Sequence, residues 1–177
     1  DMAARNALMT KVASKTKDRK AVFGIRDIED TQPDFYEDTS ALEFQAEVLH
    51  CIPLTKDMIS GLTFSGEVES IPSFAVVTDR TLFYPEGGGQ LGDQGRLLQD
   101  GNEYEVLDTK SQDGVIFHFT ENPLAPGKVK GILDWDRRKQ LMDHHTAVHV
   151  VGGAARNILG PHIWPVSYTH LTLPTIL

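Results

Sequence analysis

Two histidines four residues apart, His145 and His149, have the spacing that most directly suggests chemistry. On an α-helix, side chains at positions i and i+4 project from one face, so both imidazoles can bind one zinc ion. Two unrelated surface histidines are an equally good interpretation of the pair taken alone. The pair is also incomplete, because structural zinc takes four protein ligands and catalytic zinc usually takes three plus water.

The remaining candidate ligands do not complete this site. They are His50, Cys51, His118, His144 and His162. None forms a second closely spaced pair on an evident element, and His144 points about 100° away from His145 around a helix. No motif surrounds Cys51, so a buried structural thiol is a better interpretation than a nucleophile. The sequence therefore predicts half a metal site.

The second chemical motif is the string FYPEGGGQLGDQG at residues 83–95. Gly87, Gly88 and Gly89 can adopt positive φ and let a ligand approach the backbone, whose N–H groups suit phosphate or ribose oxygens. Gln90 adds a directional donor and acceptor. A flexible hairpin loop is the alternative. Carboxylates flank the string, but such loops are commonly acidic and we give an acid–base role little weight.

Composition and charge limit the function classes. The chain has 177 residues, one cysteine and a formal net charge of −8. No apolar run reaches the roughly 20 residues that a membrane span needs, and the start has no secretory apolar region. A single cysteine fits a reducing compartment, so we expect a cytoplasmic protein without an internal disulfide. An acidic chain is a poor general nucleic-acid binder, because phosphate affinity comes mostly from Lys and Arg.

Basic residues nevertheless gather in residues 1–26 and in the run Arg137, Arg138 and Lys139. We interpret both groups as solvated helix surface; a local RNA contact is the alternative. The first residue is Asp rather than Met, which indicates either a processed or trimmed chain or one that begins within a longer protein.

Hydrophobic patterning predicts an α+β fold. Residues 2–20 favour a helix, and 27–41 have the composition of a linker. Strands are expected at 42–52, 73–79, 114–120 and 128–134, with a hairpin at 95–110 that turns at Asp100–Gly101. Short, closely spaced strands suggest a small antiparallel β-barrel. A long helix should follow, capped by Asp134 or Asp136 and ended by Gly160-Pro161. Glycines 152 and 153 within it suggest close packing.

These motifs together carry a family resemblance. LFYPEGGGQLGDQG followed by HHTAVH resembles the editing region of alanyl-tRNA synthetases and is equally similar to stand-alone alanyl-tRNA editing proteins. FYEDTSALEFQAEVL resembles the segment that opens the barrel in this family, and GPHIW resembles the continuation of the archaeal-type enzymes. The resemblance runs from about residue 35 to Trp164, and the preceding helix fits the linker from the aminoacylation domain.

The resemblance implies both site residues and cofactors. His145 and His149 match two of the family's zinc ligands, and Gly87, Gly88, Gly89 and Gln90 match the motif beside the 3′ end of bound tRNA. The other two ligands, a Cys-x-x-x-His pair, lie downstream in the family. ATP and magnesium belong to the upstream aminoacylation domain. The implied protein attaches alanine to tRNA(Ala) with ATP, and hydrolyses mischarged Ser- and Gly-tRNA(Ala).

Four sections of chain are expected on this basis. Residues 1–41 are helix and linker, 42–134 the β-barrel with the glycine-rich loop, and 135–164 the start of a zinc-binding α/β editing domain. Residues 165–177 read, when back-translated, as a sequencing adapter and are expected to be non-biological. A stand-alone trans-editing hydrolase and a non-catalytic RNA-binding β-barrel are the two alternative functions.

Overall fold

The computed structural model describes residues 28–160 apart from 38, 63 and 65–70. The helix expected over residues 2–20 and the tail expected at 165–177 lie outside the described residues. No helix in the described part of the chain is both long and apolar enough to cross a membrane.

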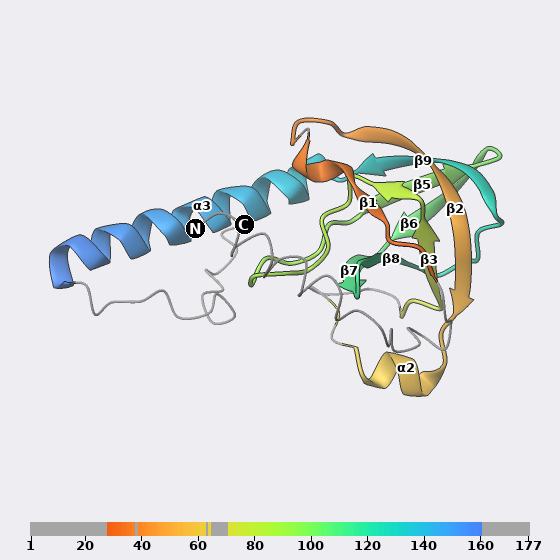
Figure 1. The fold of residues 1–177 in the computed structure, drawn as a ribbon, viewed down its shortest axis with the longest axis horizontal. Helices are drawn as coiled ribbons and strands as arrows, with labels where there is room; N and C mark the ends of the chain where they lie inside the picture. Colours follow the sequence, from red (N-terminus) through yellow and green to blue (C-terminus); the bar gives the residue numbers. More distant parts are fainter. Residues whose placement is uncertain (1–27, 38, 63, 65–70, 161–177) are drawn as a thin grey trace, which may run out of the picture.

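The described chain forms a curled antiparallel sheet followed by one long helix (Figure 1). The short elements are β1 (Gln32–Pro33), η1 (Asp34–Tyr36), α2 (Lys56–Ser60) and β4 (Arg80–Thr81). The sheet strands are β2 (Glu43–Pro53), β3 (Phe74–Thr78), β5 (Gly95–Gln99), β6 (Asn102–Val106), β7 (Asp108–Gln112), β8 (Val115–Thr120) and β9 (Gly127–Leu133). The long helix is α3 (Trp135–Leu159).

The sheet has the order β6-β5-β9-β2-β3-β8-β7. Its curl depends on β2, which pairs with β9 through its first half and with β3 through its second half. A register shift between Val48 and His50 marks the change of partner, as expected where a strand bends between two parts of a barrel. The predicted barrel is therefore present as a curled sheet, and no ladder joins its edges β6 and β7 in the described residues.

Hydrophobic clusters form on both faces of this sheet, because successive side chains of a strand face opposite sides. Val76 lies in one cluster with Val48, Phe83, Leu97 and Val129, among others. Its neighbours Ala75 and Val77 lie in the other, with Ile52, Phe117 and Phe119. The second cluster also includes Ile28, so the segment before the sheet packs against the face that carries Ala75 and Val77.

Residues 27–41, read from composition as a linker, carry β1 and η1 within their described part. β1 pairs in parallel with β4, and Phe35 is buried. The hydroxyl oxygen of Thr31 accepts a hydrogen bond from the Ile116 N–H at 3.0 Å. This segment is tied to the sheet by bonds that composition does not reveal.

The predicted long helix is confirmed. The hairpin predicted over 95–110 is present but ends at Val106, because β7 (Asp108–Gln112) pairs with β8 instead. Asp100 and Gly101 turn β5 into β6 with φ of 50° and 80°, the positive values of a tight hairpin turn. The carboxylate of Asp134 caps α3 by accepting the Arg137 N–H at 3.1 Å, and Gly160 forms its C-cap. Apart from the adjacent residues and the helix's own backbone, no atom among the described residues lies within 4 Å of a Cβ built on Gly152 or Gly153, so the close packing expected at these glycines is not seen there.

Candidate functional site

The glycine-rich string forms a narrow hairpin that leaves the sheet between β4 and β5. At its base, the Asp93 N–H donates to the Tyr84 carbonyl at 2.9 Å. At its tip, Gly87 and Gln90 exchange two backbone hydrogen bonds of 3.0 Å. Gly88 and Gly89 lie between them with φ of 59° and 85°, the conformation of a two-residue turn that favours glycine. The tip of the string is thus a hydrogen-bonded two-residue turn.

The tip is open to a ligand. Apart from its two chain neighbours, no described residue has an atom within 4 Å of a Cβ built on Gly88. Gly88 and Gly89 are exposed, and Gln90 is half-buried beside them. A flat substrate can therefore approach the backbone of the tip without meeting a side chain at this position.

One leg of this hairpin is fastened to the start of β7. The Glu86 N–H donates to the Thr109 carbonyl at 2.9 Å, and Lys110 pairs with the Glu86 carboxylate. The opposite leg of the hairpin also packs closely against β7. A Cβ on Gly92 would lie 2.3 Å from the same Thr109 carbonyl oxygen. Gly92 is therefore required for packing, whereas Gly88 is not.

A buried ion pair joins the base of the hairpin to α3. Arg138 donates through Nε to Asp93 Oδ2 at 2.9 Å and pairs with the same oxygen through Nη2. That Nη2 also donates to the Leu82 carbonyl at 2.6 Å. The Tyr84 N–H is a further donor to Asp93 Oδ2, at 2.6 Å. Arg138 is 4% exposed and Asp93 1% exposed, so this pair is excluded from solvent.

The basic run at the start of α3 is divided between core and surface. Arg137 Nη2 donates to the Gly92 carbonyl at 3.3 Å, beside the buried Arg138. Lys139 pairs with Asp143 on the exposed helix face. Our interpretation of this run as solvated surface is therefore wrong for Arg138 and holds for Lys139. Charge density alone could not separate them, because burial depends on the distant residue Asp93.

The predicted histidine pair lies on one face of α3. The Nε2 atoms of His145 and His149 are 2.9 Å apart, and their ring centroids are 4.7 Å apart. Two imidazole nitrogens on a tetrahedral zinc ion, each about 2.05 Å from the metal, lie roughly 3.3 Å apart. Since His149 is exposed, small side-chain rotations would provide that separation. The two residues fit half of a zinc site.

Of the other candidate ligands, His118 and Cys51 lie in the sheet, and His162 lies outside the described residues. His118 is fully buried in β8, where Nε2 lies 2.8 Å from Thr81 Oγ1 and Nδ1 lies 3.1 Å from the Val76 carbonyl oxygen. Burial lowers the pKa of His118 to about 4, so its ring is neutral. Cys51 lies in β2, and burial raises the pKa of its thiol. In the described part of the chain, no three His, Cys, Asp or Glu residues are grouped to hold a metal.

An aromatic cluster beside the hairpin was not predicted from the sequence. The Phe35 ring meets the Tyr84 ring edge-on at 5.3 Å, and Tyr36 lies 4.5 Å from Phe35 by ring centroids. Burial is the main cause that raises the pKa of Tyr84, and the neighbouring Tyr36 and Asp93 add to it. The segment before β2 thereby supports the first leg of the hairpin.

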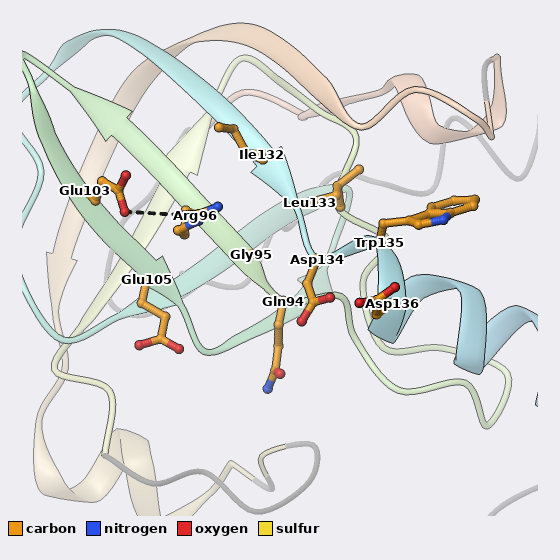
Figure 2. A pocket seen from close by; sticks show the side chains of 10 residues that line it. All are labelled: Gln94, Gly95, Arg96, Glu103, Glu105, Ile132, Leu133, Asp134, Trp135 and Asp136. Atoms are coloured by element: carbon orange, nitrogen blue, oxygen red, sulfur yellow. Dashed lines mark hydrogen bonds and ion pairs between the residues drawn. The ribbon is translucent and has the colours of Figure 1, made fainter.

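A separate pocket of about 620 Å³ lies where β5, β6 and β9 meet the first turn of α3 (Figure 2). Its charged lining is mostly acidic: Glu103, Glu105, Asp134 and Asp136 face one arginine, Arg96, which already pairs with Glu103. Such a lining repels phosphate groups. The pocket is therefore a poor site for a phosphate group.

Comparison with known proteins identifies related sequences. The family described as tRNA synthetases class II (A) matches residues 1–137. An alanine–tRNA ligase of Haloquadratum walsbyi is 39% identical over 155 residues, 87% of this chain. Those of Metallosphaera sedula and Hyperthermus butylicus are 39% and 47% identical over 79% and 57% of this chain. The chain spans 14% of the length of the first two relatives and 11% of the third.

Proposed function

This chain belongs to the class II (A) family of tRNA synthetases, and we propose that it is the section of an alanine–tRNA ligase that begins its editing site. The whole protein would attach alanine to tRNA(Ala) with ATP and hydrolyse Ser- and Gly-tRNA(Ala). ATP and magnesium would bind in its aminoacylation domain. One observation carries the editing assignment: the open glycine tip and the histidine pair stand on two segments that the Asp93–Arg138 pair fastens together.

A second hydrolytic site has a physical reason in such an enzyme. A pocket shaped for alanine cannot strongly exclude serine, which adds only a hydroxyl, or the smaller glycine. The wrong ester must then be removed after it has formed. This requires a site that accepts the aminoacylated 3′ end of tRNA.

The glycine tip would receive the terminal adenosine of the tRNA. The exposed backbone of Gly88 and Gly89 allows a ribose or base to lie against the chain. The Gln90 amide, half-buried at the end of the turn, would supply a donor and an acceptor to orient it.

His145 and His149 would hold one side of a zinc ion. The bound zinc would position the substrate or lower the pKa of a water molecule. Two neutral imidazoles bind zinc far less tightly than four ligands do. We therefore expect the 177-residue chain to bind zinc weakly and to lack deacylase activity.

Two other functions remain as alternatives with distinct expectations. A stand-alone editing hydrolase would act without an aminoacylation domain; the family match from residue 1 to residue 137 favours the synthetase. A non-catalytic RNA-binding barrel would bind tRNA without metal. The acidic pocket and the net charge of −8 disfavour that general role.

The test uses the chain extended to include the downstream segment that its relatives carry. Zinc content and Ser-tRNA(Ala) hydrolysis are measured for this protein and for His145→Ala and His149→Ala. His144→Ala is the matched control, since it removes an exposed imidazole of the same helix outside the pair. We expect zinc content and the hydrolysis rate to fall in the first two variants and to be unchanged in the control. Tight tRNA(Ala) binding with no zinc and no hydrolysis would favour the RNA-binding barrel.

A further inference from the structure

The attachment of α3 to the sheet depends on its first turn. Within this described helix, Arg138 is the one buried residue. Its partners are Asp93 and the Leu82 carbonyl, and the adjacent Arg137 donates to the Gly92 carbonyl. Beyond this turn the helix leads away from the sheet in Figure 1, with Val150 and Val151 each 65% exposed. Among the described residues, α3 is therefore fastened to the rest of the fold at its first turn.

This geometry makes the histidine pair sensitive to small changes at the first turn. An α-helix rises about 1.5 Å per residue, so His149 lies about 16 Å along the axis from Arg138. A tilt of about 10° at Arg138 would move His149 by about 3 Å. A misplacement of about 1 Å can reduce a catalysed rate by about 100-fold. Small tilts therefore matter to any site shared by the hairpin and the helix.

The hydrogen bonds of the Asp93–Arg138 ion pair suit a role in fixing the orientation of α3. Two nitrogens of the Arg138 guanidinium meet Asp93 Oδ2, and one of them also meets the Leu82 carbonyl. The planar guanidinium holds these partners in a rigid fork, whereas a lysine ammonium is a point charge on a flexible stem. The Tyr84 N–H fixes the carboxylate from the hairpin side. Charge-assisted hydrogen bonds of this kind are strong and directional.

We propose that Asp93 and Arg138 are positioning residues that set the distance between the glycine tip and the histidine pair. This proposal rests on the proposed editing function for its consequence, but the geometry can be measured independently. Neither residue needs to touch the substrate.

The geometric test is a distance measurement on the 177-residue chain. Spin labels are placed at Leu91→Cys on the hairpin and Val150→Cys on α3, with the single native cysteine removed by Cys51→Ser. Leu91 and Val150 are both exposed. We expect one narrow distance distribution, which broadens or shifts in Arg138→Lys. The control is Arg96→Lys, which makes the same exchange in the exposed pair with Glu103.

The functional test uses the extended chain and single-turnover hydrolysis of Ser-tRNA(Ala). Arg138→Lys should lower the hydrolysis rate by about 10- to 100-fold with little change in KM or zinc content. Arg96→Lys should behave as the unmodified protein does. If Arg138 only stabilised the fold, Arg138→Lys would lower stability but would not lower the hydrolysis rate at an unchanged KM.

The outcomes separate the two proposals. A folded Arg138→Lys chain that keeps the narrow distance distribution overturns the positioning role. If Arg138→Lys does not fold, the same distance measurement is made on Asp93→Asn, which keeps the side-chain shape. A narrow, unchanged distribution in that variant likewise overturns the positioning role. If the distance broadens while the unmodified extended chain hydrolyses no Ser-tRNA(Ala), the positioning role stands and the editing function fails.

Discussion

The Nε2 of His118 in β8 and the Oγ1 of Thr81 in β4 lie 2.8 Å apart, and both side chains are fully buried. Because His118 Nδ1 donates to the Val76 carbonyl, its neutral Nε2 accepts the Thr81 hydroxyl proton. The Thr81 oxygen in turn accepts the Phe83 N–H at 3.0 Å. A neutral histidine therefore fixes the backbone where the chain enters the glycine hairpin.

This arrangement makes stability depend on pH. Burial lowers the pKa of His118 to about 4 in the folded chain, against about 6.5 when unfolded. Between these two pKa values the unfolded state binds more protons than the folded state. The stabilising contribution of neutral His118 to the free energy of unfolding is therefore fully present above about pH 6.5 and is lost as the pH falls toward 4. The linked loss is roughly 3 kcal/mol. Denaturant unfolding at several pH values measures it, and an equal pH slope in His118→Gln would contradict this assignment.

The buried Asp93–Arg138 pair should matter far more to stability than its exposed counterpart. Arg138→Met leaves the Asp93 carboxylate buried without its cation, which destabilises by about 3–5 kcal/mol. Arg96→Met breaks the exposed pair with Glu103 and should change stability by less than about 1 kcal/mol. Urea unfolding of both variants gives the comparison. Equal losses would mean that the buried pair contributes no more than a surface contact.

Gly131 in β9 should not tolerate a side chain. A Cβ there would lie 2.0 Å from Cε1 of the Phe44 ring, which packs edge-on against Phe83. Gly131→Ala should therefore destabilise by about 1–3 kcal/mol through overpacking. Gly153→Ala is the control, because its Cβ meets no described atom and the helix should gain up to about 1 kcal/mol. Thermal unfolding checks both signs, and a neutral Gly131→Ala would refute the clash.

Substitutions at two glycines of the hairpin should have different effects, one on hydrolysis and the other on stability. Gly88 has φ of 59° and open space around it, and asparagine tolerates this conformation. Gly88→Asn should leave thermal stability nearly unchanged but reduce Ser-tRNA(Ala) hydrolysis at least about 10-fold, since the new side chain occupies the tip. Gly92→Ala should instead destabilise the fold, because its Cβ would meet the Thr109 carbonyl. Full hydrolysis by Gly88→Asn would remove the tip from the substrate site.

Local patterns predicted much of this fold. Alternating side chains located β2, short strand-like segments located β3, β8 and β9, and the Asp100–Gly101 turn located the β5–β6 hairpin. Asp134 was one of two predicted caps for α3 and is the one that accepts the Arg137 N–H. These features depend on residues close together in the sequence, which periodicity and turn chemistry describe well.

Long-range contacts were harder to foresee. The five-residue α2 is too short to produce a hydrophobic period, and only its Thr55 cap marks it. Nothing in the acidic composition of residues 27–41 indicates that Phe35 packs on Tyr84. In the site, spacing placed the two histidines on one helix face, but the pairing of Asp93 with Arg138 depends on how the whole sheet curls.

The most direct test of the proposed editing site is single-turnover hydrolysis of Ser-tRNA(Ala) by the extended chain carrying both His145→Ala and His149→Ala. We predict that this double variant loses hydrolysis at least about 100-fold, as expected when a metal ligand set is broken. The His144→Ala control should hydrolyse at the unmodified rate. Undiminished hydrolysis by the double variant would contradict the assignment of this histidine pair to the editing site.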